Sequence, residues 1–203
     1  MQNLLIKLKD PDLLNHIRPF FNPLTNLFSQ VDQQYNEVAQ KYGFQCTGCQ
    51  DNCCETLFYH HTYLEYGYII EGVLELSNTL AKEIINRSKL YCIEHNKSNQ
   101  QPFRMMCPIN EQGKCLTYTH RPLICRFHGL AHELHTPNRP VSYGPGCDYF
   151  STLCEQNQLP YYSFDRTELY RQMAQLEQSL RKELCMTTKL KMTIASILED
   201  AFI

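Results

Sequence analysis

Cysteine is the residue type most able to carry chemistry in this chain, because 11 of the 203 residues are cysteine and most of them are clustered. The densest run is Cys46-Thr-Gly-Cys49-Gln-Asp-Asn-Cys53-Cys54. Two thiolates separated by two residues can converge on one metal ion. Four thiols so close together are an inefficient way to fill a hydrophobic core, so this run predicts metal ligands.

Four further cysteines lie in the middle of the chain, in short segments rich in proline, glycine and arginine: Cys107, Cys115, Cys125 and Cys147. With the first run they make eight candidate ligands. Eight thiolates can fill two four-thiolate sites that hold zinc or [4Fe–4S] clusters, or serve one polynuclear centre with supporting thiols. The adjacent side chains of Cys53 and Cys54 point in different directions, so both can bind one ion only with strain. Either the pair serves two nearby metals, or one thiol binds and the other supports it.

The other three cysteines are scattered, and we expect them to be small buried side chains: Cys92, Cys154 and Cys185. An odd total of cysteines fits a full set of disulfides poorly. The apolar run at Leu4–Ile6 is too short for a secretory signal, and no stretch approaches the ~18 apolar residues of a membrane-spanning helix. We therefore expect a cytoplasmic protein whose thiols stay reduced and bind metal.

The charge balance excludes two classes of partner. Lys and Arg total 19 and Asp and Glu total 21, which gives a formal net charge of −2. The chain has no basic surplus that would attract nucleic acid or an anionic membrane. The partners that we expect are a metal ion or cluster and a protein substrate or protein partner, with no nucleic acid and no membrane.

The elements that must position the cysteines read as helices. Apolar residues at three- and four-residue spacing predict a helix over 24–42 that ends at Gly43, and a second from Thr62 with a break near 72–78. Further helices are expected from a capping pair at Asp165 and Glu168, and over 188–201. Between about 96 and 164 the periodicity disappears, and a bound metal would supply the order that this stretch lacks.

We therefore expect a mostly α fold, in which helices pack around an irregular, cysteine-rich region ordered by metal. The whole chain, 1–203, is expected to form one domain. Residues 46–150 would be its cysteine-cluster metal-binding core, with helices before and after it.

Residues 46–150 resemble the YkgJ-type cysteine-cluster family, a zinc- or iron-chelating domain. The resemblance rests on the first cysteine run, on "GKCLTYTHRPLICRFHG" and on the later "GCD". The matching positions are Cys46, Cys49, Cys53, Cys54, Cys107, Pro108, Gly113, Cys115, Tyr118, Arg121, Pro122, Cys125, Arg126 and Cys147. The resemblance implies metal binding without a settled reaction. A similar cluster occurs in the flagellin lysine methylases, where an iron–sulfur centre is implied, but this chain is much shorter than those enzymes.

Other side chains of this motif could support the centre. Arg121 and Arg126 flank Cys125 and can offset the negative charge of a thiolate-bound metal by hydrogen bonds to sulfur; surface ion pairs are the alternative. Tyr118 either donates to a ligand or packs. His128 and His132 have the spacing of one helix face, so a mixed Cys/His site is possible, although packed or solvated histidines are the simpler interpretation.

The sequence thus predicts a metal-binding protein that holds an iron–sulfur cluster or clusters, or zinc, with a redox or protein-modifying role. Iron–sulfur is preferred because a zinc ribbon would show two CxxC pairs. One alternative is a non-catalytic, zinc-stapled interaction module. Another, which rests on the resemblance, is a methylase-like enzyme that acts on a protein side chain. No catalytic residue is assigned, and the metal, the reaction and the oligomeric state stay open.

Overall fold

The computed structural model describes residues 7–46, 53–98 and 103–202, with the backbone alone for Cys53. Helices dominate it: α1 Pro11–Ile17, α2 Phe21–Tyr42, α3 Tyr63–Leu74, α4 Asn78–Lys97, α5 Leu123–Phe127, α6 Asp148–Asn157, α7 Thr167–Glu183 and α8 Ile194–Phe202. The mostly helical fold class is confirmed. That a metal orders the cysteine-rich region stays a prediction. No helix of the described residues is long and apolar enough to cross a membrane.

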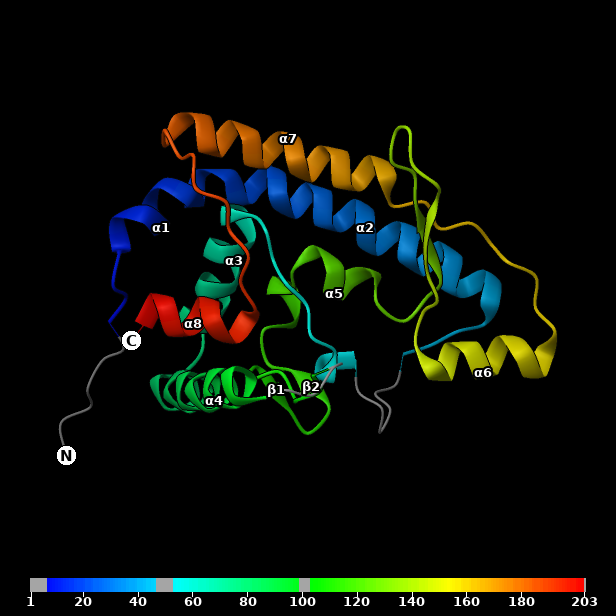
Figure 1. The fold of residues 1–203 in the computed structure, drawn as a ribbon, viewed down its shortest axis with the longest axis horizontal. Coiled ribbons are helices and arrows are strands. Elements are labelled where there is room, and N and C mark those ends of the chain that lie inside the picture. Colours follow the sequence, from blue (N-terminus) through cyan, green and yellow to red (C-terminus); the bar gives the residue numbers. More distant parts are fainter. Residues whose placement is uncertain (1–6, 47–52, 99–102, 203) are drawn as a thin grey trace.

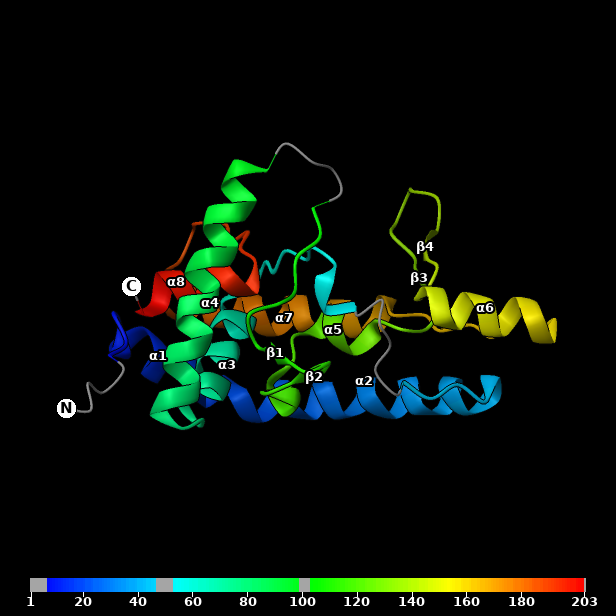
Figure 2. The same ribbon diagram turned by 90° about the horizontal axis from the view of Figure 1, so that it is seen from below.

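The two longest apolar stripes lie together. Helices α2 and α7 pack side by side along one edge of the molecule, with α3 and α5 beneath them (Figure 1). Helix α8 packs on α4 at the opposite edge (Figure 1), and the view from that edge shows the two helices crossing (Figure 2). One hydrophobic cluster runs from α1 to α8 through the cysteine region, so the flanking helices share their core with residues 46–150.

Helix α2 forms where its apolar spacing predicts it. Leu24, Leu27, Phe28 and Val31 are all buried on the face that packs into the core. Gly43 ends the helix in a left-handed conformation with φ 61°, and its N–H donates to the carbonyl of Gln40 over 3.1 Å. Glycine adopts this conformation without a steric penalty, so the predicted helix end is confirmed.

Helix α3 begins and ends as expected, but its glycines have another role. Thr62 caps the helix by accepting from the Glu65 N–H over 3.2 Å. The predicted break falls between Leu74 and Asn78, where Ser77 caps α4. Gly72 lies inside α3, where an added Cβ would lie 2.6 Å from the Cβ of His120. This glycine therefore permits close packing instead of ending the helix.

Two expected helix starts are displaced. Helix α7 begins at Thr167 after Arg166, without a side-chain cap, while Asp165 accepts from the Thr167 N–H over 2.8 Å. Helix α8 begins at Ile194 and not near 188, because Met192 pairs with His60 in an isolated β-bridge. The segment before α8 is therefore held in an extended conformation.

The stretch without periodicity contains short elements only. Strands β1 Asn110–Glu111 and β2 Lys114–Cys115 form one antiparallel hairpin, and β3 His132–Leu134 and β4 Ser142–Gly144 form another. Between them lies α5, and after them α6. This agrees with the weak strand signal of the sequence.

Candidate metal centre

A cavity of about 650 Å³ collects the candidate cysteines. Its lining comes from α2, α3, α4, α5 and α8, and from the loops between them. Six of the eight predicted ligands line it: Cys46, Cys54, Cys107, Cys115, Cys125 and Cys147. The other two predictions, Cys49 and the side chain of Cys53, lie outside the described residues.

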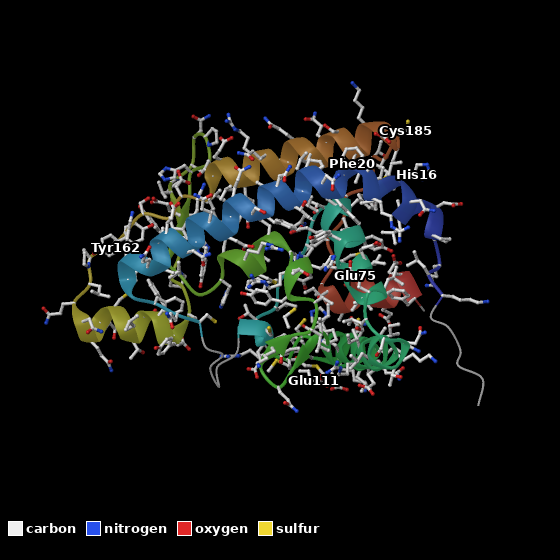
Figure 3. The ribbon with its side chains drawn as sticks, turned by 180° about the vertical axis from the view of Figure 1, so that it is seen from behind. His16, Phe20, Glu75, Glu111, Tyr162 and Cys185 are labelled. Atoms are coloured by element: carbon white, nitrogen blue, oxygen red, sulfur yellow. The ribbon has the colours of Figure 1, made fainter. Side chains whose placement is uncertain are left out.

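The three scattered cysteines are absent from the described lining of this cavity. Cys92 is buried, as expected for a small apolar side chain. Cys154 is partly exposed, and Cys185 is exposed at the end of α7 (Figure 3), so the expectation of burial is wrong for Cys185. None of the nine cysteines whose side chains the structure describes forms a disulfide.

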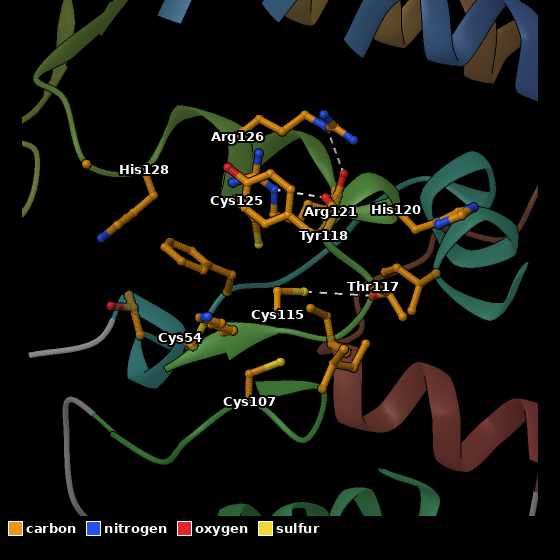
Figure 4. Close-up of a pocket in the computed structure, with 18 of the residues that line it drawn as sticks. Cys54, Cys107, Cys115, Thr117, Tyr118, His120, Arg121, Cys125, Arg126 and His128 are labelled. Atoms are coloured by element: carbon orange, nitrogen blue, oxygen red, sulfur yellow. Dashed lines mark hydrogen bonds between the residues drawn. The ribbon is translucent and has the colours of Figure 1, made fainter. Parts of the chain in front are cut away.

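Backbone pairing brings three of the lining thiols together. The N–H of Cys107 donates to the carbonyl of Cys54 over 2.9 Å, beside the bridge between Thr56 and Arg104. The β1–β2 hairpin then places Cys115 opposite Asn110. Cys54, Cys107 and Cys115 are therefore held on adjacent segments at one side of the cavity (Figure 4).

A fourth thiol comes from α5. The N-terminal end of this short helix is fixed from α3, because the buried Glu65 carboxylate accepts from the Leu123 N–H over 2.8 Å. The Cys125 side chain points toward the side of the cavity that carries Cys54 and Cys115 (Figure 4). Glu65 thus acts on the position of Cys125 through the backbone at the start of α5.

These four thiols influence each other's protonation. Burial, with smaller contributions from the neighbouring Cys54 and Cys115, raises the pKa of Cys107 to about 12. Burial also raises the pKa of Cys125 well above its usual value, with smaller contributions from the same neighbours, while Arg121 opposes the rise. Without a cation beside them, Cys107 and Cys125 are therefore neutral thiols at pH 7.

Cys46 and Cys147 lie at a different part of the cavity wall, near Tyr35 of α2. Burial raises the pKa of the Tyr35 phenol, and Cys46 and Cys147 add to that rise. Cys147 is also the N-cap of α6, where its Sγ accepts from the Phe150 N–H over 3.4 Å. The described thiols thus form a set of four and a set of two.

The predicted supporting side chains make ion-pair and packing contacts, which the sequence analysis gave as the alternatives to contacts with a metal ligand. Arg126 donates to the Arg121 carbonyl over 2.9 Å, to Asp32 over 2.6 Å and to the Thr119 carbonyl over 2.5 Å. These contacts hold the loop before α5 against α2. The predicted hydrogen bond from Arg126 to a metal-bound sulfur stays a prediction.

Arg121 packs on Tyr118. The guanidinium carbon lies 3.5 Å from the centroid of the Tyr118 ring, and Nε donates to the Tyr118 carbonyl over 3.1 Å. Tyr118 is otherwise exposed, so packing is the contact observed for it. Arg121 also lowers the pKa of Cys115 and Cys125, although burial outweighs it at both thiols. It is therefore the cation that favours their thiolate forms.

The two histidines with helical spacing do not share a helix. His128 follows the last residue of α5 with ψ 142° and lines the cavity. His132 lies in β3, where its Nδ1 donates to the Leu130 carbonyl over 3.0 Å. The one-face interpretation is therefore wrong, because the chain becomes extended between them.

Several lining residues escaped the sequence analysis, and some of them come from helices outside residues 46–150. Asp32 and Tyr35 of α2 and Ile194 of α8 line the cavity, as does the buried His60. Asp32 interrupts the apolar stripe of α2, which is the one sequence signal that could have indicated it. His60 has no such signal, because its place depends on the pairing with Met192.

No three His, Cys, Asp or Glu side chains within the described ranges are grouped so that they could hold a metal ion. The donor chemistry of the cavity nevertheless fits a thiolate-bound metal centre. Six thiols face it, and Arg121, Arg126 and Lys114 supply positive charge against the single carboxylate of Asp32. Thiolates bound to a metal carry a negative charge that such cations offset.

Comparisons with known proteins give no relative. No family model matches the chain, no curated protein matches it, and no solved structure matches it. The resemblance to the YkgJ-type cysteine-cluster family therefore rests on the motif residues alone.

Proposed function

We propose that this chain is a metal-binding protein whose cavity thiols hold an iron–sulfur centre, with zinc as the second choice. The proposal rests on which cysteines line the cavity. Six predicted ligands line one cavity, while the three cysteines predicted as bystanders are not in its described lining. Packing in a hydrophobic core would not separate predicted ligands from the other cysteines, whereas binding of a shared metal centre would.

We assign the first centre to the set of four thiols, Cys54, Cys107, Cys115 and Cys125. Each of the last three has its pKa raised in part by the Cys54 thiol, which requires proximity. Counting along the sequence would group Cys54 with Cys46 instead. The backbone bond between Cys107 and Cys54 supports the spatial grouping. Cys46 and Cys147 are then candidates for a second centre.

The shape of the site favours a cluster over a single zinc ion. Zinc binds four thiolates at ~2.3 Å in a closed tetrahedron, which requires all four sulfurs to converge on one point. The described thiols line a cavity and are not so closely grouped. An iron–sulfur cluster takes one thiolate at each of several iron atoms and so suits thiols that surround a space.

The chain's own residues set the conditions of such a centre. An iron–sulfur cluster supplies one-electron transfer when bound. Much of the cavity lining is apolar, and Arg121 places positive charge near Cys115 and Cys125. Both features act on the stability of the reduced and oxidised states. A redox role is therefore the function that we propose, in the cytoplasm, where reducing conditions keep the thiols available.

Anaerobic purification with analysis of iron, acid-labile sulfide and zinc tests this proposal. We expect a brown protein with iron and sulfide, and a loss of most metal in Cys115→Ser. The matched control is Cys154→Ser, which removes a thiol outside the cavity and should keep full metal content. A colourless protein with stoichiometric zinc and no sulfide would show that the centre is zinc and not an iron–sulfur cluster. Unchanged metal content in Cys115→Ser would overturn the ligand assignment.

A further inference from the structure

The cavity is lined by apolar residues as well as by thiols. We call five of these residues its apolar end: Ile69 of α3, Tyr91 of α4, Ile109 after Cys107, and Ile194 and Ala195 of α8. The total volume of about 650 Å³ lies within the ~300–1,000 Å³ typical of small-molecule sites. A metal centre held by the thiols would occupy only the part of the cavity that they line.

One polar group in the lining of this cavity has an unmet hydrogen bond. His60 is 2% exposed, and its Nε2 atom has no hydrogen-bond partner among the described residues. Its backbone is fixed on both sides, since the N–H donates to the Met192 carbonyl over 2.7 Å and the carbonyl accepts from Met192 over 3.0 Å. A buried imidazole nitrogen without a partner costs free energy, which a ligand that bonds to it would recover.

The charged residues in the described lining of the cavity are not among those of its apolar end. Arg126 and Arg121 lie against Asp32 of α2, and Arg121 acts on Cys115 and Cys125. His60 itself is held neutral, because burial lowers its pKa more than the nearby Glu65 raises it. An anionic ligand would therefore find no cation at the apolar end, and the nearby Glu65 carboxylate already accepts from the Leu123 N–H and the Thr62 hydroxyl.

We propose that the apolar end binds a small, uncharged, largely apolar organic molecule through one hydroxyl or carbonyl group that hydrogen-bonds to Nε2 of His60. Aliphatic walls and the Tyr91 ring contact the body of the molecule, and the imidazole fixes its orientation. The molecule then lies beside Cys107, because Cys107 acts on the pKa of Tyr91 and stands two residues before Ile109. This site goes beyond metal binding and does not depend on which metal the thiols hold.

Phenol and toluene are matched probes, because they share shape and differ in the hydroxyl group. Isothermal titration calorimetry on the purified full chain, with the metal that it carries, should show phenol binding about five- to tenfold more tightly than toluene, the value of one net hydrogen bond. His60→Leu should remove this difference and keep toluene binding. The control His61→Leu, which changes the exposed neighbour, should preserve it.

A second variant keeps the inference testable if His60→Leu fails to fold. Ile194→Phe narrows the cavity and should weaken both probes together while His60 is intact. Metal content, measured on each variant, should stay at the wild-type level in His60→Leu. Any of three results would overturn the inference: equal affinities for the two probes, no binding of either probe at millimolar concentration, or a difference in affinity between phenol and toluene that persists in His60→Leu. A metal-free protein that still prefers phenol would contradict the proposed function alone.

Discussion

Arg126 of α5 donates through Nη1 to Oδ2 of Asp32 on α2 over 2.6 Å. The arginine side chain is only 4% exposed and directly follows Cys125, while Asp32 comes from a helix outside the cysteine motif. A charge-assisted hydrogen bond therefore fastens the segment that carries Cys125 to the N-terminal helix. The stability of the cysteine region should depend on this contact.

Asp32→Asn tests that dependence. Removing the carboxylate leaves a nearly buried guanidinium without its counter-ion, which should lower the free energy of unfolding by about 1–3 kcal/mol. Asp32 is 42% exposed, so water replaces part of the lost contact and the full cost of a broken buried pair is not expected. Urea unfolding followed by circular dichroism measures the change.

The control for Asp32→Asn is Glu168→Gln. Glu168 pairs with Arg171 on the solvent face of α7, where both side chains are more than half exposed. An exposed pair contributes little, so this variant should change stability by no more than about 1 kcal/mol. If both variants lowered the free energy of unfolding equally, burial of Arg126 would not strengthen its contact with Asp32.

Acid should destabilise the protein through its buried histidines. Burial lowers the pKa of His60 and of His132 below the usual value of about 6.5. Protonation then favours the unfolded chain, so their contribution to stability is complete above about pH 6.5 and is lost as the pH falls toward the folded-state pKa. Urea unfolding should show this fall. His60→Leu should flatten it, and an unchanged slope would exclude His60 as a cause.

Local patterns predict the parts of this fold that local interactions determine. The stripe of α2 and its end at Gly43 follow from helical spacing and from glycine's conformational freedom. The spacing of the cysteines and their motif context predicted as ligands the six thiols that line the cavity. Neither inference needs knowledge of how the helices pack.

The features that sequence reasoning missed depend on long-range pairing. Cys54 meets Cys107 because their segments pair across some fifty residues, and no periodicity encodes that register. His60 reaches the cavity through its bridge to Met192. The spacing of His128 and His132 suits a helix, but a four-residue interval cannot distinguish a helix from a turn followed by a strand.

Metal binding should release protons and strengthen with pH. Burial raises the pKa of Cys107 to about 12 and raises that of Cys125, so both must lose a proton to become ligands. The apparent affinity for Co²⁺, a coloured probe of thiolate sites, should increase steeply between about pH 6.5 and pH 8. Titration of the metal-depleted chain, followed by absorbance, measures it. A flat dependence would mean that the binding groups are already deprotonated or are not these thiols.

Glu65 should control both stability and metal binding, because it joins the start of α3 to the start of α5. Its buried carboxylate accepts from the Leu123 N–H over 2.8 Å and from the Thr62 hydroxyl over 2.7 Å. Glu65→Ala leaves both donors without a partner and should lower the unfolding free energy by about 2–3 kcal/mol. It should also reduce metal content by displacing Cys125.

Glu65→Gln is the matched variant, since its amide oxygen can still accept from Leu123 while its NH₂ donates to Thr62. It should therefore keep most of the metal that Glu65→Ala loses, as measured by metal analysis after identical purification. Glu71→Ala, which removes a partly exposed pair with Arg18, should leave metal content unchanged. If Glu65→Ala unfolds more easily yet retains full metal, then Cys125 is positioned by the packing of α5 against α2 and not by this carboxylate.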